Sequence, residues 1–404
     1  MKLDLDQFIF ALSNTVDLVG VDEVLHGKRV GYMAWNCAEK LDSSASKAKR
    51  LLQIGLLHDC GVSTTKEHHK LVNELDWENS QIHCRIGSDR MKYFGPLHSF
   101  AEPILHHHTS WGSLKNKQIS DEIKIEANLI FLLDRVDYFG QIVPGPNWIA
   151  KKKIIRDKVR SYAGTYFHPE LVDTFLRTSE NEAFWICLDP IMLMDFMEQH
   201  KKEEDHISVS NDQLKTVAEL FAQIVDAKSP FTAEHSLGVS RLAKHMAEQS
   251  GLDQETCLKI EVAGLLHDLG KLQIPDNVLE KTGPLDDYEL SCMQHHSYVS
   301  YQILKKITGF EKIALWVANH HEALDGSGYP FHRMGDDLGI ESRIVAVADI
   351  FQALAQNRPY RKAIPVGEII SFLQKKAKSG KLDNNLVEMI ADTRETCYQT
   401  AMVA

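Results

Sequence analysis

The chain has 404 residues, of which 44% are hydrophobic and 25% charged, and its formal net charge is −11. This length suits two to three domains of ordinary size, and the composition is that of a globular protein. The acidic balance argues against a surface for polymeric nucleic acid or anionic lipid, and no stretch approaches the roughly 18 apolar residues that a membrane helix needs.

The chain opens with MKLDLDQFIFAL, in which acidic residues interrupt the apolar ones and no basic start is present. A secretory signal is therefore not expected. Seven cysteines, odd in number and without CxxC pairs, suit a reducing compartment better than a disulfide framework. We expect a cytoplasmic protein without a membrane partner.

Residues 1–204, the predicted amino-terminal domain, carry a spaced set of histidines and aspartates. The set consists of His26, His58, Asp59, His83, His107, His108 and Asp134. His68 and His69 lie in the polar stretch GVSTTKEHHKLV and are expected on a solvated face. The later segment 144–190 has no clear periodicity, so the sequence only indicates that it closes this half.

A polar segment at 201–212, KKEEDHISVSND, has no apolar periodicity and is typical of a linker or a helix start. We place the domain boundary between residues 204 and 205, which leaves about 200 residues on each side, enough for one core apiece. No convincing alternating strand is found in either half. The sequence therefore predicts an all-α fold with two helical domains in tandem.

Residues 205–404, the predicted carboxyl-terminal domain, contain a second set of the same kind. It consists of His235, His267, Asp268, His296, His320, His321 and Asp349. In LKIEVAGLLHDLGKL the apolar residues recur at spacings of four, three and four, which predicts a helix that Gly270 would end. RIVAVADIFQALAQ, 343–356, is another apolar helix candidate, with Asp349 as its single acid.

The two sets share their spacing. The lone histidine precedes the His-Asp pair by 32 residues in both, the third histidine precedes the His-His pair by 24 in both, and the two His-Asp pairs lie 209 residues apart. Such repetition fixes the architecture. Neighbouring helical residues point about 100° apart, so a His-Asp or His-His pair serves two adjacent ions better than one. Imidazole and carboxylate ligands without thiolate predict two divalent transition-metal ions, Mn, Fe or Ni, bridged by Asp268 in the second set.

Six motifs within 210–365 resemble the HD-GYP family of cyclic dinucleotide phosphodiesterases. They are KSPFTAEHS (228–236), LLHDLGKLQIP (265–275), KTGPL (281–285), HHSYVSYQIL (295–304), HHEALDGSGYP (320–330) and RIVAVADIFQAL…RPYR (343–361). The resemblance implies a metal-dependent helical fold in which the seven residues of the second set bind metal. His295 competes with His296, and we prefer His296 because the family places its histidine four residues before a small residue, here Ser300.

The resemblance also implies catalytic and substrate-binding residues and a metal count. Asp268 would bridge the ions, Lys271 would contact phosphate during catalysis, and Arg358 and Arg361 would bind substrate phosphate through planar guanidinium groups. Members with three metals carry a glutamate four residues before the first histidine. This chain has Phe231 there, so we expect two ions and not three.

The amino-terminal set keeps the ligands but lacks the substrate-handling residues. Val62 stands where Lys271 stands in the second set, HHHTSWGS lacks the Glu and the DGSGYP loop, and no RPYR follows Asp134. Cyclic dinucleotide hydrolysis is therefore not expected in this half, which would have a regulatory or structural role. The set is a candidate second metal site; the alternative is a degenerate scaffold whose histidines only pack and hydrogen-bond.

The sequence thus predicts a metal-dependent phosphodiesterase acting on cyclic di-GMP or 3′,3′-cyclic GMP–AMP. It would release a linear dinucleotide, or continue to mononucleotides, through a hydroxide that bridges the metals. Two alternatives stay open: a non-catalytic nucleotide-binding signalling module of tandem HD-type domains, and a nucleotide phosphohydrolase of the wider HD superfamily. No motif reports the base preference, the partner proteins or the oligomeric state.

Overall fold

The computed structural model describes residues 2–19, 25–41, 44–62, 80–201, 206–228, 233–357 and 361–402. Helices account for most of them, which confirms the predicted all-α class. Among the described residues, strands are limited to β1 (Lys2–Asp4) and β2 (His206–Ser208), which pair antiparallel with Leu3 opposite Ile207. The sequence did not reveal this pair because three residues are too few to show an alternation.

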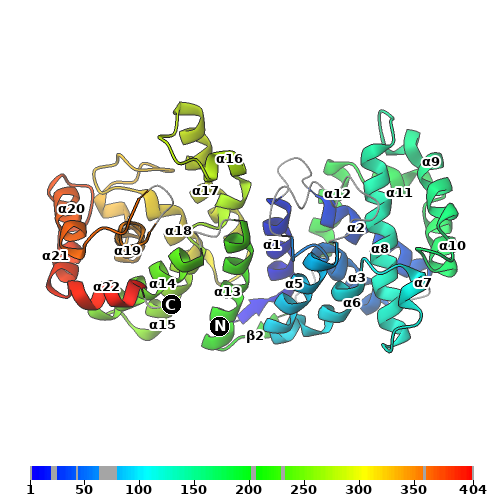
Figure 1. The fold of residues 1–404 in the computed structure, drawn as a ribbon, viewed down its shortest axis with the longest axis horizontal. Coiled ribbons are helices and arrows are strands. Elements are labelled where there is room, and N and C mark those ends of the chain that lie inside the picture. Colours follow the sequence, from blue (N-terminus) through cyan, green and yellow to red (C-terminus); the bar gives the residue numbers. More distant parts are fainter. Residues whose placement is uncertain are drawn as a thin grey trace. The chain divides into compact units, whose positions relative to one another are not determined.

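The chain divides into two compact units (Figure 1). The amino-terminal unit is Leu5–Asp205, and the carboxyl-terminal unit joins His206–Ala404 to the first four residues. The sequence-based boundary follows residue 204. The structure differs from it in assigning the first strand to the carboxyl-terminal unit, because the main chain of β1 hydrogen-bonds to β2.

The amino-terminal unit is built around α8 (Asp121–Ile142), a helix of 22 residues that is buried from Glu126 to Gly140. The helices α2 and α6 pack against it. Its other elements are α1 (Leu5–Asp17), α2 (His26–Lys40), α3 (Ala45–Leu57), α5 (Ser80–Tyr93), η1 (Gly95–Phe100), α6 (Ala101–His106), α7 (Trp111–Leu114), α9 (Trp148–Ser161), α10 (Pro169–Thr178), α11 (Glu182–Ile186) and α12 (Pro190–His200).

Segment 144–190, which the sequence left unassigned, contains α9, α10 and α11 and ends at the start of α12. Side chains cap these short helices: Asn147 accepts from Ala150 N, and Asn181 accepts from Phe184 N. Asparagine before a helix and proline at its first position were the signals in the sequence that could have found them.

The carboxyl-terminal unit is built around α19 (Ile340–Ala355), the apolar helix predicted at 343–356. The helices α14, α18 and α20 pack against it. Its other elements are α13 (Asn211–Lys228), α14 (Ala233–Gln249), α15 (Gln254–Leu266), η2 (Leu269–Gln273), α16 (Asp276–Leu279), α17 (Asp287–Leu304), α18 (Glu311–Ala318), η3 (Asn319–His321), η4 (Gly335–Asp337), α20 (Val366–Lys378), α21 (Asn384–Asp392) and α22 (Arg394–Met402).

The turn after α15 differs from the prediction. The helix ends at Leu266, and Gly270 lies inside η2 instead of ending the helix. A Cβ on Gly270 would lie 2.1 Å from the main-chain oxygen of His296, so this glycine lets η2 lie directly against α17. Gly61 has the same role in the amino-terminal unit, where a Cβ would lie 1.9 Å from His83 O.

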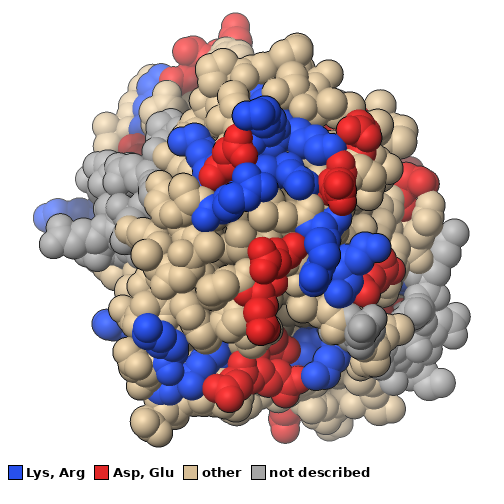
Figure 2. All heavy atoms as spheres, turned by 90° about the vertical axis from the view of Figure 1, so that its right-hand side faces the viewer, with Lys and Arg blue, Asp and Glu red and all other residues tan. Residues whose placement is uncertain are grey.

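Charges of both signs are interspersed on the face of the amino-terminal unit that Figure 2 shows. This face carries α9, in which Asp157 pairs with Lys153 and Arg160 while Lys152 pairs with Glu182. The described residues of this face therefore form no continuous basic stripe. No helix in the described part of the chain is both long and apolar enough to span a membrane.

Candidate metal centre

The seven predicted ligands of the carboxyl-terminal unit lie together, although they come from five elements. His235 lies on α14, His267 and Asp268 follow α15, His296 lies on α17, His320 and His321 end η3, and Asp349 lies on α19. All are buried except His321, which is partly exposed. His295, the competitor of His296, is exposed to solvent, whereas His296 is buried within the cluster.

The two oxygens of Asp268 face different histidines. Oδ2 lies 3.2 Å from His267 Nε2 and 3.7 Å from His235 Nε2. Oδ1 lies 3.5 Å from His296 Nε2, which in turn lies 3.2 Å from His320 Nε2. We call these two groups the Oδ2 lobe and the Oδ1 lobe.

Two further ligands complete the lobes. Asp349 Oδ1 lies 3.1 Å from His235 Nε2 and 3.7 Å from His267 Nε2, so it belongs to the Oδ2 lobe. His321 groups with His296 and His320 in the Oδ1 lobe. Each lobe thus offers at least three ligand atoms around one point, and the carboxylate of Asp268 lies between them.

Hydrogen bonds to the outer ring nitrogens fix the imidazoles with Nε2 turned inward. His267 Nδ1 bonds to Gly264 O at 2.8 Å, and His296 and His320 bond in the same way to the carbonyl three residues earlier, each at 2.6 Å. His235 Nδ1 bonds to Gln352 Oε1 at 2.5 Å. Metal-binding histidines are commonly held by such outer contacts.

These distances fit bound ions. Metal–nitrogen bonds of ~2.0–2.1 Å at tetrahedral angles place two imidazole nitrogens ~3.3–3.4 Å apart, and the His235–His267 separation is 3.3 Å. Asp268 Oδ1 is buried and finds no hydrogen-bond partner among the described residues. A buried carboxylate oxygen of this kind is costly unless a cation satisfies it.

The electrostatics keep most of the ligands in the form that metals bind. The exception is His267, because burial alone would lower its pKa but Asp268 raises it. Burial lowers the pKa of His296 to about 3 and that of His321 to about 4, so both rings are neutral at pH 7. Burial alone would raise the pKa of Asp268, but the neighbouring His267 and Lys271 hold it well below its usual range. The centre is therefore an anionic carboxylate among mostly neutral imidazoles.

Lys271 lies between the centre and a cavity of about 500 Å³. Its Nζ is 2.6 Å from Asp268 Oδ2, and its side chain also lines the cavity. The cavity is further lined by Lys281 and by Thr282–Leu285, the KTGPL motif. A cation that reaches both the carboxylate and an open cavity is well placed to hold a phosphate beside the metal ligands.

The two predicted arginines differ from Lys271. Arg361 donates to the main-chain oxygens of Ala353 and Leu354, so in the structure it caps α19, and a phosphate contact would require it to leave these carbonyls. Arg358 and Phe231 lie outside the described residues, as do His68 and His69. Glu234, next to His235, is exposed to solvent.

Glu322, the glutamate of HHE, ties the loop Asp325–Pro330 to the end of η3, which carries two of the candidate ligands. The buried carboxylate of Glu322 accepts hydrogen bonds from Phe331 N at 2.6 Å and from Arg333 N at 3.1 Å. Tyr329 N bonds to His321 O at 3.1 Å, and the two rings lie 4.8 Å apart. The motif HHE…DGSGYP is thus one packed assembly.

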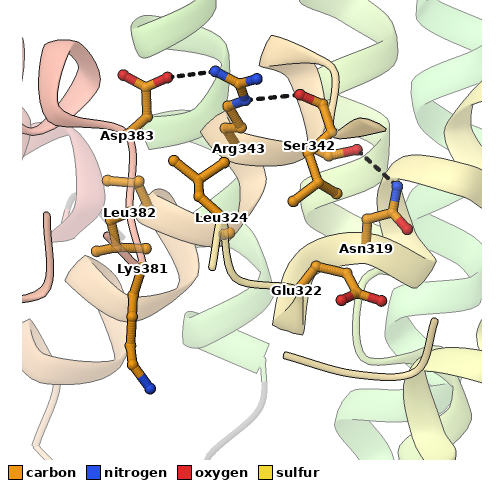
Figure 3. Close-up of a pocket in the computed structure, with 11 residues that line it drawn as sticks. Asn319, Glu322, Leu324, Ser342, Arg343, Lys381, Leu382 and Asp383 are labelled. Atoms are coloured by element: carbon orange, nitrogen blue, oxygen red, sulfur yellow. Dashed lines mark hydrogen bonds and ion pairs between the residues drawn. The ribbon is translucent and has the colours of Figure 1, made fainter. Parts of the chain in front are cut away.

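Figure 3 shows the small cavity behind η3, of about 10 Å³, which is lined by Glu322 among others. Asn319 Nδ2 donates to Ser342 Oγ at 3.2 Å, and Arg343 pairs with Asp383 at 2.8 Å (Figure 3). A volume of this size holds at most about one water. The cavity therefore belongs to the support of η3 and is not a nucleotide site.

The amino-terminal unit repeats this geometry. Asp59 Oδ2 lies 3.5 Å from His58 and 3.6 Å from His26, whereas Oδ1 lies 3.4 Å from His83 and 3.6 Å from His107. Asp59 Oδ1, like its counterpart, is buried without a hydrogen-bond partner among the described residues. The seven residues of the amino-terminal set lie in one cluster: His26, His58, Asp59, His83, His107, His108 and Asp134.

Charged neighbours distinguish the Oδ2 lobe of the amino-terminal unit. Asp134 pairs with the buried Arg135 at 2.9 Å, whereas an isoleucine follows Asp349. His26 Nδ1 bonds to Asp137 instead of a glutamine amide; burial would lower the pKa of His26, but Asp137 raises it to about 9. A metal in this lobe would share Asp134 with a guanidinium.

The amino-terminal unit has no charge at the position that corresponds to Lys271. Val62, at the position of Lys271, is buried and uncharged. The cavity beside His108, of about 300 Å³, is lined by Lys117 and otherwise by uncharged side chains such as Gln81 and Ser113. Among the described residues, a lysine that contacts both the central aspartate and a cavity is therefore found in the carboxyl-terminal unit, as Lys271.

Comparison with known proteins agrees with a chain of two HD-type units. The HD domain family matches residues 25–138 and again residues 219–386. The 3′3′-cGAMP-specific phosphodiesterase 1 of Vibrio cholerae is 36% identical over 99% of this chain and 94% of its own length. The 3′3′-cGAMP-specific phosphodiesterase 3 of the same organism is 34% identical over 78% of this chain and 67% of its own. The chain belongs to the HD-GYP family of cyclic dinucleotide phosphodiesterases.

Other members of the HD-GYP family match shorter parts of the chain or only its fold. A cyclic di-GMP phosphodiesterase response regulator of Xanthomonas campestris is 37% identical over 43% of this chain and 46% of its own. The crystal structure of a cyclic GMP-AMP-specific phosphodiesterase of V. cholerae covers 98% of both chains with a TM-score of 0.68 and 22% identity, which shows the same two-unit fold.

Proposed function

We propose that the carboxyl-terminal unit hydrolyses 3′,3′-cyclic GMP–AMP, with cyclic di-GMP as the alternative substrate. The observation that carries the reaction type is the carboxylate of Asp268, whose two oxygens face two separate histidine groups. The preference for the hybrid dinucleotide is supported by the relative that matches 99% of this chain, whereas the cyclic di-GMP relative matches 43%.

We further propose two divalent ions in this centre, one in each lobe. The ligand set is imidazole and carboxylate without thiolate, which suits Mn, Fe or Ni. When bound, the ions would activate water for attack and neutralise the charge that develops at phosphorus. Metal analysis of the full chain and of Asp59→Ala would count them, and three tightly held ions in the carboxyl-terminal centre would contradict the proposal.

The side chains of the unit would position the substrate for in-line attack. Asp268 fixes the separation of the two lobes, and its carboxylate stays ionised because its pKa is depressed by its neighbours. Lys271 holds the scissile phosphate at the rim of the cavity, which is also lined by Lys281, itself paired with Glu289. Glu322 and Tyr329 keep the loop beside His321, so that it covers one side of the centre.

The two dinucleotides, offered side by side with added Mn²⁺, test the substrate proposal directly. We expect higher kcat/KM for 3′,3′-cyclic GMP–AMP and a linear dinucleotide as the first product. Higher kcat/KM for cyclic di-GMP would reverse the substrate assignment. Binding of either dinucleotide without turnover would instead support the non-catalytic signalling module.

For the amino-terminal unit we propose metal binding without cyclic dinucleotide hydrolysis, in a domain that folds around its own centre. The repeated lobes and the unsatisfied Asp59 Oδ1 support the metal. Val62 in place of a lysine supports the lack of phosphodiester chemistry. This unit would then brace or regulate the carboxyl-terminal unit.

A further inference from the structure

The two centres differ at the residue that follows the third histidine. In the amino-terminal unit Cys84 follows His83 on α5, and in the carboxyl-terminal unit Ser297 follows His296 on α17. Both side chains are buried. One position of an otherwise repeated site therefore carries sulfur in one copy and oxygen in the other.

The Cys84 sulfur lies against the Oδ1 lobe. Its Sγ is 3.6 Å from His83 Nε2, and this nitrogen is 3.2 Å from His107 Nε2 and 3.4 Å from Asp59 Oδ1. A tetrahedral ion with bonds of ~2.3 Å to sulfur and ~2.0–2.1 Å to nitrogen would place these two atoms ~3.6 Å apart, and nitrogen and a carboxylate oxygen ~3.4 Å apart. All three separations, each measured from His83 Nε2, thus match those of one ligand shell.

The neighbouring groups support the same lobe. Asp59 Oδ1 is more than nine-tenths buried and finds no hydrogen-bond partner among the described residues, so the lobe contains an unsatisfied anionic oxygen. The Oδ2 lobe, by contrast, already holds the guanidinium of Arg135 against Asp134. An ion that enters this unit therefore finds its better ligands beside Cys84.

Two other side chains show that the position is specific. Cys60 is also buried and follows Asp59 directly, but its Sγ is directed to Gly87 O at 3.8 Å. Ser297 Oγ lies 3.5 Å from Gln294 O, a main-chain carbonyl of its own helix. Neither contact is with the inner nitrogen of a histidine.

We propose that Cys84 is a thiolate ligand of the amino-terminal centre, together with His83, His107 and Asp59, and that this centre selects Zn²⁺. Thiolate favours zinc over the harder ions that suit an imidazole and carboxylate set. On binding, the thiol proton passes to solvent and the Sγ–metal bond forms without a change of oxidation state. The inference rests on metal binding by the amino-terminal unit and is independent of the substrate of the other unit.

Cobalt(II) substitution of the full chain tests the ligand. Thiolate bound to Co²⁺ gives a sulfur-to-cobalt charge-transfer band in the near ultraviolet, which nitrogen and oxygen ligands do not give. We expect this band in the wild-type chain, its loss in Cys84→Ser, and its retention in Cys60→Ser. Zinc X-ray absorption should show a sulfur shell at ~2.3 Å that disappears with the same variant.

Variants of the two bridging aspartates assign the band to one centre. Asp268→Ala should keep it, and Asp59→Ala should lose it together with bound metal. Ser297→Cys should add a second band if the two positions are equivalent. Far-ultraviolet circular dichroism of Cys84→Ser and of Cys84→Ala would exclude unfolding as the cause of a loss.

Three results would overturn the inference. One is a band that persists in Cys84→Ser. Another is a wild-type chain that shows no charge-transfer band although it binds cobalt in the amino-terminal centre. Loss of bound cobalt in Asp59→Ala would establish that binding. The third is unchanged metal content in Asp59→Ala, which would refute metal binding by this unit. Turnover of the cyclic dinucleotides, measured in parallel, tests the proposed function separately.

Discussion

Replacement of Gly270 by alanine should disable the carboxyl-terminal centre without replacing any of its ligands. The added Cβ would lie 2.1 Å from His296 O, about 1.3 Å short of the 3.4 Å at which ordinary contact begins. Both partners are main chain, so no flexible side chain can yield. Either η2 or α17 must move, and with it Asp268 relative to His296.

The expected size of the effect follows from that displacement. A shift of about 1 Å at reacting groups costs on the order of 100-fold in rate, and overpacking of this kind costs roughly 1–3 kcal/mol of stability. We therefore expect Gly270→Ala to lose about two orders of magnitude in kcat, with reduced metal content. Cyclic dinucleotide turnover, metal analysis and urea unfolding measure the three quantities.

Two glycines supply controls. A Cβ on Gly367, in the first turn of α20, would meet nothing within 4 Å, so Gly367→Ala should keep full activity. Gly61→Ala introduces the same clash in the amino-terminal unit and should destabilise that unit while hydrolysis continues. Wild-type turnover and metal content in Gly270→Ala would refute the argument that this contact sets the ligand geometry.

Four further predictions address the ligands, the cation, the division of labour and the pH dependence. Asp268→Ala should abolish turnover with the helical fold retained; a residual rate above about a tenth of wild type would contradict the bridging role. Lys271→Ala should raise KM or lower kcat and leave the metal content unchanged, whereas loss of metal would count against a phosphate contact. Replacing His58 and Asp59 together should leave hydrolysis in place in folded protein; if it fell as far as in Asp268→Ala, the amino-terminal centre would also do chemistry. Burial alone would raise the pKa of Glu261, but two lysines at 2.8–2.9 Å hold it below its usual range. The stabilisation by ionised Glu261 is therefore present above its unfolded pKa and lost as the pH falls through its folded pKa. The free energy of unfolding, measured against pH, should be about 1–3 kcal/mol higher in wild type than in Glu261→Gln at pH 7. The difference should be small in acid.

The sequence by itself determined the fold class of the protein and predicted which residues would gather in each cluster. A repeated order of histidines and aspartates at the same spacing predicted two helical units with one cluster each, because helix-borne ligands must recur at fixed positions to converge. The choice of His296 over His295 also followed from the sequence, and the buried and exposed positions of the two rings agree with it.

Other features depended on contacts between residues far apart in the chain, which local periodicity does not encode. The sequence could not show that Asp268 presents one oxygen to His267 and the other to His296, or that Arg361 is engaged by the carbonyls at the end of α19. The sequence-based prediction that Gly270 ends the helix was wrong. A glycine that ends a helix and a glycine that lets another main chain approach closely look the same in the local sequence.

Cys84 illustrates the same limit. It and Cys60 each follow a candidate ligand directly, and nothing in the sequence separates them. The packing of α5 against α6 turns one sulfur toward His83 and His107, while the other meets the carbonyl of Gly87. The sequence supplied the residue types that a metal site needs. The tertiary structure decided which of their atoms lie close together, because side-chain directions are set by packing.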